Sequence, residues 1–183
     1  QGMGGNPKAP LPKQDNQNQY TQQCDQLQAG LSSLQARIES MQLKDVQEVA
    51  AIEEQVQADP WTPGMFTDSL RANYAAWLVR HQDGRVMGYA LQMFAPDVAH
   101  LLTIAVAPEF QQKGIGSILL AWTEMQALGA NLDAQMLEVR VSNQAARALY
   151  QKQGYQAIGI RKGYYKGVDG QSEDAQVLQK NLL

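Results

Sequence analysis

The sequence contains few of the residues that build metal centres or disulfide frameworks. Its 183 residues include one cysteine, Cys24, and two histidines, His81 and His100. These are too few for a His/Cys zinc site, and a single cysteine cannot form an intrachain disulfide. A lone thiol is typical of a reducing compartment, so we expect a cytoplasmic protein without a metal.

The sequence also lacks a long apolar run and a strong excess of either charge. We find no secretory signal and no segment apolar enough to cross a bilayer, so we expect no membrane partner. The formal net charge of -3 argues against a nucleic-acid partner. A hydrophobic content of 44% with 18% charged residues is typical of a globular chain, and the length suits one α/β domain.

The N-terminal region differs in composition from the rest. Residues 1–3 resemble the remainder of a cleaved tag followed by a start methionine, and residues 4–34 are expected to form a tail and a helix. Residues 4–19, rich in Gly, Pro, Asn and Gln, would be the tail. Within 20–34 an apolar stripe follows helical spacing, made of Tyr20, Cys24, Leu27, Leu31 and Leu34. Docking on its own domain or a lattice contact fits this stripe better than the alternative, self-association through residues 20–34.

Residues 35–183 are expected to form the folded domain, with elements in the order βααβββαβαββ. Strands are predicted over 37–41, 77–80, 86–94, 101–106, 136–141, 156–161 and 174–180, and helices over 43–57, 63–72, 115–129 and 143–153. Asp83-Gly84 between two strands is typical of a hairpin turn. This order predicts a mixed sheet with helices on both faces.

A glycine-containing turn, Gln111–Gly116 (QQKGIG), follows the apolar strand at 101–106 and precedes a helix. Glycines let a ligand approach the backbone, and the unpaired N–H groups of the helix start favour an anion such as a phosphate. A Walker A loop is excluded because Lys113 precedes Gly114 rather than following it. A dinucleotide fingerprint is excluded because Leu119 occupies the place of its third glycine. An ordinary strand-to-helix turn is the remaining alternative.

The turn resembles the Gln/Arg-x-x-Gly-x-Gly/Ala motif of the GCN5-related N-acetyltransferase (GNAT) superfamily, which binds the pyrophosphate of coenzyme A. A second segment, Leu137–Tyr155 (LEVRVSNQAARALYQKQGY), resembles the other cofactor-contact region of this superfamily, closest to its RimI-type family. Pro60-Trp61 and the segment from Ile160 to Ala175 resemble parts of the same family. The resemblance covers about residues 36–183.

The resemblance implies a GNAT fold of class α/β (α+β). Its sheet would be mixed and mostly antiparallel, with six to seven strands flanked by about four helices and preceded here by an extra helical extension. It also implies acetyl-CoA as the acetyl donor and a peptide N-terminus as the partner. In RimI-type enzymes that terminus is the N-terminal alanine of a small-subunit ribosomal protein.

The resemblance also implies roles for individual residues, which are assigned here by their positions in the matching motifs. Glu138 would be the general base and Tyr150 the general acid; the alternatives are a salt bridge to Arg140 or another cation for Glu138, and a core aromatic for Tyr150. The positions expected to bind the cofactor are Ile104, Ala105, Val106, Gln111, Gln112, Lys113, Gly114, Ile115, Gly116, Ser117 and Asn143. Val106 N–H could polarise the thioester carbonyl.

Several assignments stay open at this point. Trp61 and Tyr165 either line the peptide groove or simply pack, and the two histidines are expected to be structural residues at strand ends rather than bases. Cys24 lies outside the motifs, so direct transfer is favoured over a cysteine nucleophile. The rival functions are acetylation of a small amine or a lysine side chain, and a non-catalytic acyl-CoA-binding scaffold.

Overall fold

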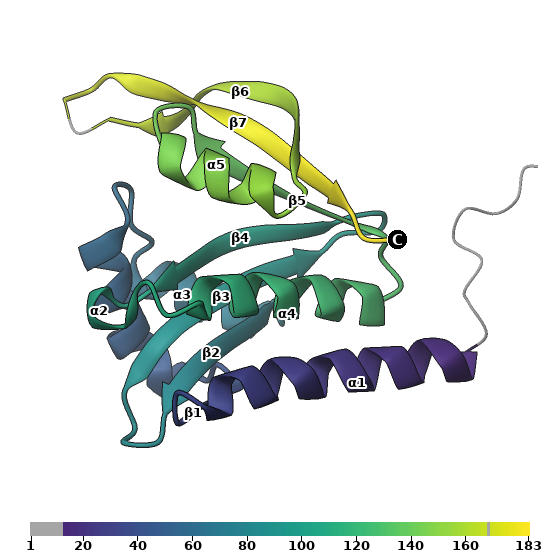
Figure 1. Ribbon diagram of the computed structural model, residues 1–183. Helices are drawn as coiled ribbons and strands as arrows, with labels where there is room; N and C mark the ends of the chain where they lie inside the picture. Colours follow the sequence, from purple (N-terminus) through teal and green to yellow (C-terminus); the bar gives the residue numbers. More distant parts are fainter. Residues whose placement is uncertain (1–12, 168) are drawn as a thin grey trace, which may run out of the picture.

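A single sheet of seven strands organises the part of the chain that the structure describes. The computed structural model describes residues 13–167 and 169–183, with the strand order β1-β2-β3-β4-β5-β7-β6. Neighbouring strands are antiparallel except β4 and β5, which run parallel. The elements are α1 (Lys13–Ser32), β1 (Ala36–Ser40), η1 (Leu43–Asp45), α2 (Val46–Val56), α3 (Pro63–Arg71), β2 (Ala75–His81), β3 (Val86–Phe94), β4 (Ala99–Val106), η2 (Pro108–Phe110), α4 (Ile115–Gly129), β5 (Ala134–Arg140), α5 (Gln144–Lys152), β6 (Gln156–Lys166) and β7 (Ser172–Asn181). This order confirms the predicted one (Figure 1).

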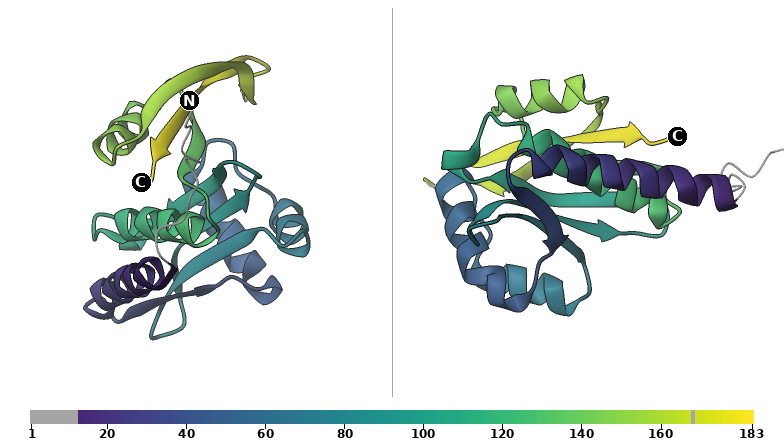
Figure 2. Two further views of the ribbon diagram at one scale, coloured as in Figure 1. Left: turned by 90° about the vertical axis from the view of Figure 1, so that its right-hand side faces the viewer. Right: turned by 60° about the horizontal axis from the view of Figure 1, so that its bottom comes forward.

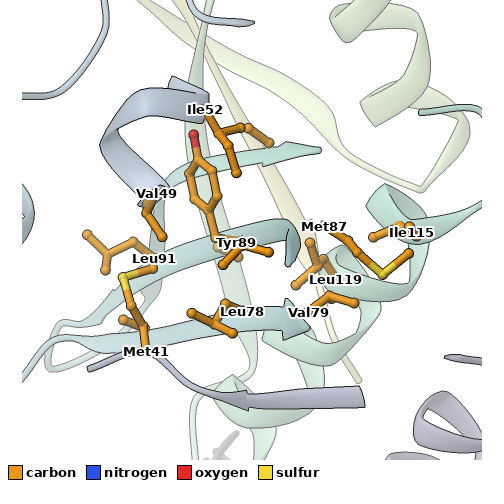
Figure 3. Close-up of a cluster of buried hydrophobic side chains, with 14 of the residues drawn as sticks. Met41, Val49, Ile52, Leu78, Val79, Met87, Tyr89, Leu91, Ile115 and Leu119 are labelled. Carbon is orange, nitrogen blue, oxygen red and sulfur yellow. The ribbon is translucent and has the colours of Figure 1, made fainter. Parts of the chain in front are cut away.

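Helices cover both faces of the β1–β4 part of the sheet. α1 and α4 lie side by side on one face, and α2 and α3 lie on the other (Figures 1 and 2). Successive side chains of a strand point to opposite faces. Gln92 of β3 therefore reaches α4, while Tyr89 reaches α2. Between these layers lies the apolar core, which includes Val49, Ile52, Leu78, Val79, Tyr89, Leu91, Ile115 and Leu119 (Figure 3).

Helix α1 packs against the chain's own domain. Leu31 of its stripe is 0% exposed and belongs to the main core cluster. The Tyr20 hydroxyl donates to Gln126 Oε1 of α4 at 2.8 Å, and its ring lies beside Gly129. The stripe therefore packs within the chain, which agrees with the expected docking on its own domain.

The predicted tail is wrong in part, because α1 already begins at Lys13 rather than near residue 20. The last proline of the N-terminal segment is Pro12, and the following residues are mostly Gln, Asn and Asp. Glutamine has good helix propensity, so packing of the apolar stripe on α4 extends the helix backwards through this polar stretch. The assignments made for residues 1–12 lie outside the described residues. Across residues 13–167 and 169–183, no helix has the length and apolarity to span a membrane.

Strands β4 and β5 pair at one end only. Their ladder consists of Ala99 with Gln135 and His100 with Met136, whereas β4 pairs with β3 along its whole length. From Leu101 onward, the edge of β4 that faces β5 is therefore open. This divergence separates the β1–β4 part of the sheet from the β5-β7-β6 part, against which α5 lies (Figure 1).

A buried polar network joins the two parts at the end where β4 and β5 pair. The Gln92 amide donates to Gln135 Oε1 and to the Thr123 carbonyl, both at 3.0 Å. Gln135 in turn donates to Thr123 Oγ1 at 3.0 Å and to the Tyr155 hydroxyl at 3.1 Å. Because each buried amide has partners, the network holds β3, α4 and β5 together without an unpaired polar group.

The C-terminal hairpin is longer than the sequence predicted. β6 reaches Lys166 rather than ending at 161, and β7 begins at Ser172 rather than at 174. The ladder shifts register between Arg161 and Tyr165, where Gly163 adopts a φ of +62°. This irregularity interrupts the alternation of side chains, so the pattern gave no sign that the strand continues.

Candidate active site

The divergence of β4 and β5 opens onto a cavity of about 450 Å³. Most of the predicted site residues line it. These are Trp61, Ile104, Ala105, Val106, Gly116, Ser117, Glu138, Asn143, Tyr150 and Tyr165. A second cavity, of about 730 Å³ between α5 and the β6–β7 hairpin, contains none of them. The first cavity is therefore the candidate active site.

The open edge of β4 offers backbone groups to this cavity. Ala107 N–H donates to the Met87 carbonyl of β3, and peptide groups alternate in direction along an antiparallel strand. Those of Ile104 and Val106 consequently point away from β3, toward the cavity. The Gln57 side chain donates to the Ile104 carbonyl at 3.3 Å, and the Gln111 side chain donates to the Val106 carbonyl at 3.1 Å. Ala105, between Ile104 and Val106, directs its N–H and C=O groups toward β3, with which it pairs in the sheet.

The glycine turn forms an open start to α4. Gly114 is the N-cap of the helix and has a φ of +84°. Apart from its chain neighbours, no heavy atom of the described residues lies within 4 Å of the position that a Cβ would take. The first intrahelical bond runs from Ile118 N–H to the Gly114 carbonyl, which leaves the N–H groups of residues 115–117 without helical acceptors. This end of the helix can accept an anion.

The seven predicted turn residues divide into three groups. Gly116 and Ser117 line the cavity, whereas Gln111, Gln112, Lys113 and Gly114 form an exposed turn outside it. Ile115 is 1% exposed and its side chain belongs to the core. Gln112 has a φ of +63°, a left-handed conformation that the sequence did not predict.

Glu138 projects from the middle of β5, and its side chain is only 4% exposed. Its Oε2 lies 2.6 Å from His100 Nε2 of β4. Within the described residues its Oε1 is buried and has no hydrogen-bond partner, and it lies 3.9 Å from Arg161 Nε of β6. The proposed pair with Arg140 is not formed, because that guanidinium binds Glu173 and lies 4.3 Å from the centre of the Tyr165 ring. Glu138 thus has a partner on one oxygen and a free acceptor on the other.

Two residues of the Asn143–Tyr150 block line the cavity from α5. Asn143 is the N-cap of this helix, and its Oδ1 accepts from Ala146 N–H at 3.1 Å. Tyr150 packs edge-on against Tyr155, with ring centroids 5.7 Å apart, and burial raises its pKa to about 12. The Tyr150 hydroxyl therefore remains protonated at neutral pH and can donate a proton.

Trp61 and Tyr165 both pack and line the cavity. Trp61 lies against Phe66, with ring centroids 5.4 Å apart, in the segment between α2 and α3. Tyr165 lies in β6 beside Arg140 and Tyr164, and burial, followed by the nearby Tyr164 and Glu138, raises its pKa. The two alternatives considered for these residues are therefore not exclusive.

Sequence reasoning missed Glu53 as a cavity residue. This carboxylate is 1% exposed and accepts from Tyr89 Oη at 2.6 Å, Thr103 Oγ1 at 3.2 Å and Trp61 N–H at 3.0 Å. It connects the Trp61 segment to the sheet. Its position on the apolar stripe of α2, four residues after Val49, is a sign that could have been recognised.

His100 lies near the start of β4, as the sequence predicted. Its contact with Glu138 was not predicted. The two residues are 38 positions apart in the sequence and meet because β4 and β5 are neighbours at this point. His81 differs, since it bonds Asp83 in the β2–β3 hairpin.

Comparison with known proteins gives consistent matches. Residues 42–155 match the model of a family described as the acetyltransferase (GNAT) family. Two relatives are [ribosomal protein bS18]-alanine N-acetyltransferases. The one from Escherichia coli (strain K12) is 33% identical over 141 residues, covering 77% of this chain and 94% of the relative. The one from Haemophilus influenzae is 32% identical, with coverages of 77% and 95%. A solved structure, the ribosomal-protein-S18-alanine N-acetyltransferase from Escherichia coli, superposes with a TM-score of 0.72 at 31% identity over 80% of this chain and 94% of that one.

Proposed function

Because the chain belongs to the GNAT acetyltransferase family, and is thus an acetyl-CoA-dependent N-acetyltransferase, we propose that its substrate is the N-terminal alanine of a small-subunit ribosomal protein. The substrate named for its relatives in Escherichia coli and Haemophilus influenzae supports this assignment. The cytoplasmic location predicted from the sequence belongs to the same proposal. The observation that carries it is Glu138, a buried carboxylate with one free acceptor oxygen in a cavity between diverging strands.

The residues around the cavity fit coenzyme A. The open turn at Gly114 and the free N–H groups that begin α4 would hold the pyrophosphate, with Lys113 as the nearby cation. The exposed edge of β4 at Ile104 and Val106 would pair with the amide groups of the pantetheine arm. When bound, acetyl-CoA supplies an acetyl group activated as a thioester.

The catalytic residues act on protons. Glu138 would take a proton from the peptide α-ammonium, because an ammonium has no lone pair with which to attack. Val106 N–H would donate a hydrogen bond to the acetyl carbonyl oxygen as a C–N bond forms and the C–S bond breaks. Tyr150, still protonated at neutral pH, would give its proton to the departing thiolate. Trp61 and Tyr165 would flank the incoming peptide.

The test is an acetyl-transfer assay with acetyl-CoA and a panel of hexapeptides that begin with alanine or another residue. Peptides with a blocked N-terminus and one lysine, polyamines and aminoglycosides complete the panel. We expect turnover on alanine-starting peptides, with the product acetylated at its α-amine by mass spectrometry. Turnover confined to small amines or to lysine would overturn the proposal.

Glu138→Gln tests the role of the base in the same assay. We expect kcat to fall by about 10²–10⁴-fold while the affinity for acetyl-CoA, measured by calorimetry, is retained. Glu54→Gln, on the exposed side of α2, is the matched control and should leave both quantities unchanged. Wild-type turnover in Glu138→Gln would show that this carboxylate is not the base.

A further inference from the structure

His100 makes the closest polar contact of the proposed base. Its Nε2 lies 2.6 Å from Glu138 Oε2, and its side chain is 17% exposed compared with 4% for Glu138. His100 pairs with Met136 across the last rung of the β4–β5 ladder, and Glu138 follows two residues later on the same face of β5. The imidazole thus lies where β4 and β5 still pair, next to the point at which the two strands diverge.

Because of this contact, the two oxygens of the Glu138 carboxylate have different surroundings. Oε2 is held by His100, whereas Oε1 is buried and has no hydrogen-bond partner in the part of the chain that the structure describes. A carboxylate without such a contact could rotate about its last side-chain torsion, because that torsion is broad. Held through Oε2, the group presents Oε1 as its acceptor in a fixed orientation.

The other charged side chains near Glu138 do not hold its carboxylate as closely as His100. Arg161 Nε of β6 lies 3.9 Å from Oε1, and the Arg140 guanidinium of β5 binds Glu173 instead. Glu53 of α2 and Asp59, which follows α2, line the same cavity.

We propose that His100 is a positioning residue that holds the Glu138 carboxylate through Oε2 and so keeps Oε1 directed at the substrate ammonium. This inference rests on the proposed function, since it assumes that Glu138 is the base. An Nε2–H group donates a hydrogen bond to a carboxylate oxygen, so Oε2 is held in place while Oε1 accepts the substrate proton.

The experiment compares kcat and KM at pH 8 for wild type, His100→Ala and His100→Gln, with acetyl-CoA and an alanine-starting hexapeptide. His81→Gln is the matched control because these are the only two histidines of the sequence. A glutamine amide can donate the same hydrogen bond as Nε2, so His100→Gln is the conservative variant that should restore the contact.

We expect His100→Ala, which loses the hydrogen bond, to lower kcat at pH 8 by about 10–100-fold, with the acetyl-CoA affinity unchanged. His100→Gln, which keeps a donor, should retain a kcat within about threefold of wild type, and His81→Gln should match wild type.

Wild-type kcat in His100→Ala, or a loss of kcat in His100→Gln as large as that in His100→Ala, would overturn the inference. If His100→Ala fails to fold, His100→Phe takes its place, because it keeps a ring but has no donor. The outcome for the proposed function is separate. Full activity in Glu138→Gln would show that Glu138 is not the base, whereas an inactive Glu138→Gln together with a His100→Ala variant that behaves like His81→Gln refutes only the role of His100.

Discussion

Tyr150 is a proton donor whose availability depends on its burial. Its pKa is raised to about 12, so the neutral hydroxyl persists well above the ordinary tyrosine value of 10.0. We expect Tyr150→Phe to lower kcat by about 100-fold with little change in acetyl-CoA affinity. In wild type, deprotonation of this group should cause no loss of kcat below pH 10, since a raised pKa keeps the acid form populated. Stopped assays from pH 7 to 10 measure both effects.

Tyr74→Phe is the control for this substitution. Tyr74 precedes β2 and does not line the cavity, so kcat should remain at the wild-type value. Wild-type kcat in Tyr150→Phe would assign the proton transfer to another donor.

Single residues also show how far the sequence could predict the site. Glu138 could be found because a carboxylate between Leu137 and Val139 in an apolar strand requires a partner or a function. His100 could not be connected to it, because the contact depends on which strands are neighbours. Glu53 could have been recognised by its place on the apolar stripe of α2, but its partners Tyr89 and Thr103 could not, because they lie on the sheet.

At the scale of elements, the start of α4 depends on the conformation of one glycine. Gly114 has a φ of +84°, and space for a methyl group is available, so Gly114→Ala meets backbone strain but no clash. We expect this substitution to lower the free energy of unfolding by about 1–2 kcal/mol and to weaken acetyl-CoA binding. Urea unfolding and calorimetry measure the two quantities.

Gly116→Ala is the matched comparison in the first turn of the same helix. Its Cβ would lie 3.7 Å from Val106 Cγ2, an ordinary contact, and its backbone is helical. Stability should be unchanged or rise by up to about 1 kcal/mol, because alanine restricts the unfolded chain. Equal losses of stability in the two variants would contradict the assigned role of Gly114.

At the scale of the whole molecule, the buried network around Gln135 holds the two parts of the sheet together. Replacing Gln135 by leucine leaves Gln92, Thr123 and Tyr155 without one of their partners. We expect the free energy of unfolding to fall by about 1–3 kcal/mol, the cost of unsatisfied buried polar groups. Gln55→Leu, on the exposed surface of α2, should change it by less than about 0.5 kcal/mol. Similar values for both variants in urea unfolding would show that the network adds no stability.

The sequence by itself determined the elements and the turn of this protein. Apolar periodicity placed the helices and most strands, and the spacing of Gly114 and Gly116 after a strand indicated an anion site. These properties are local, because they follow from backbone conformation and from side chains a few residues apart.

Only the tertiary structure decided where the cleft opens and what holds the base. The β4–β5 ladder stops after two pairs, and this divergence creates the cavity and exposes the backbone of Ile104 and Val106. The partners of Glu138 come from β4 and β6, which the chain reaches through different connections. Strand order and the length of a ladder depend on packing across the whole sheet, so no local pattern specifies them.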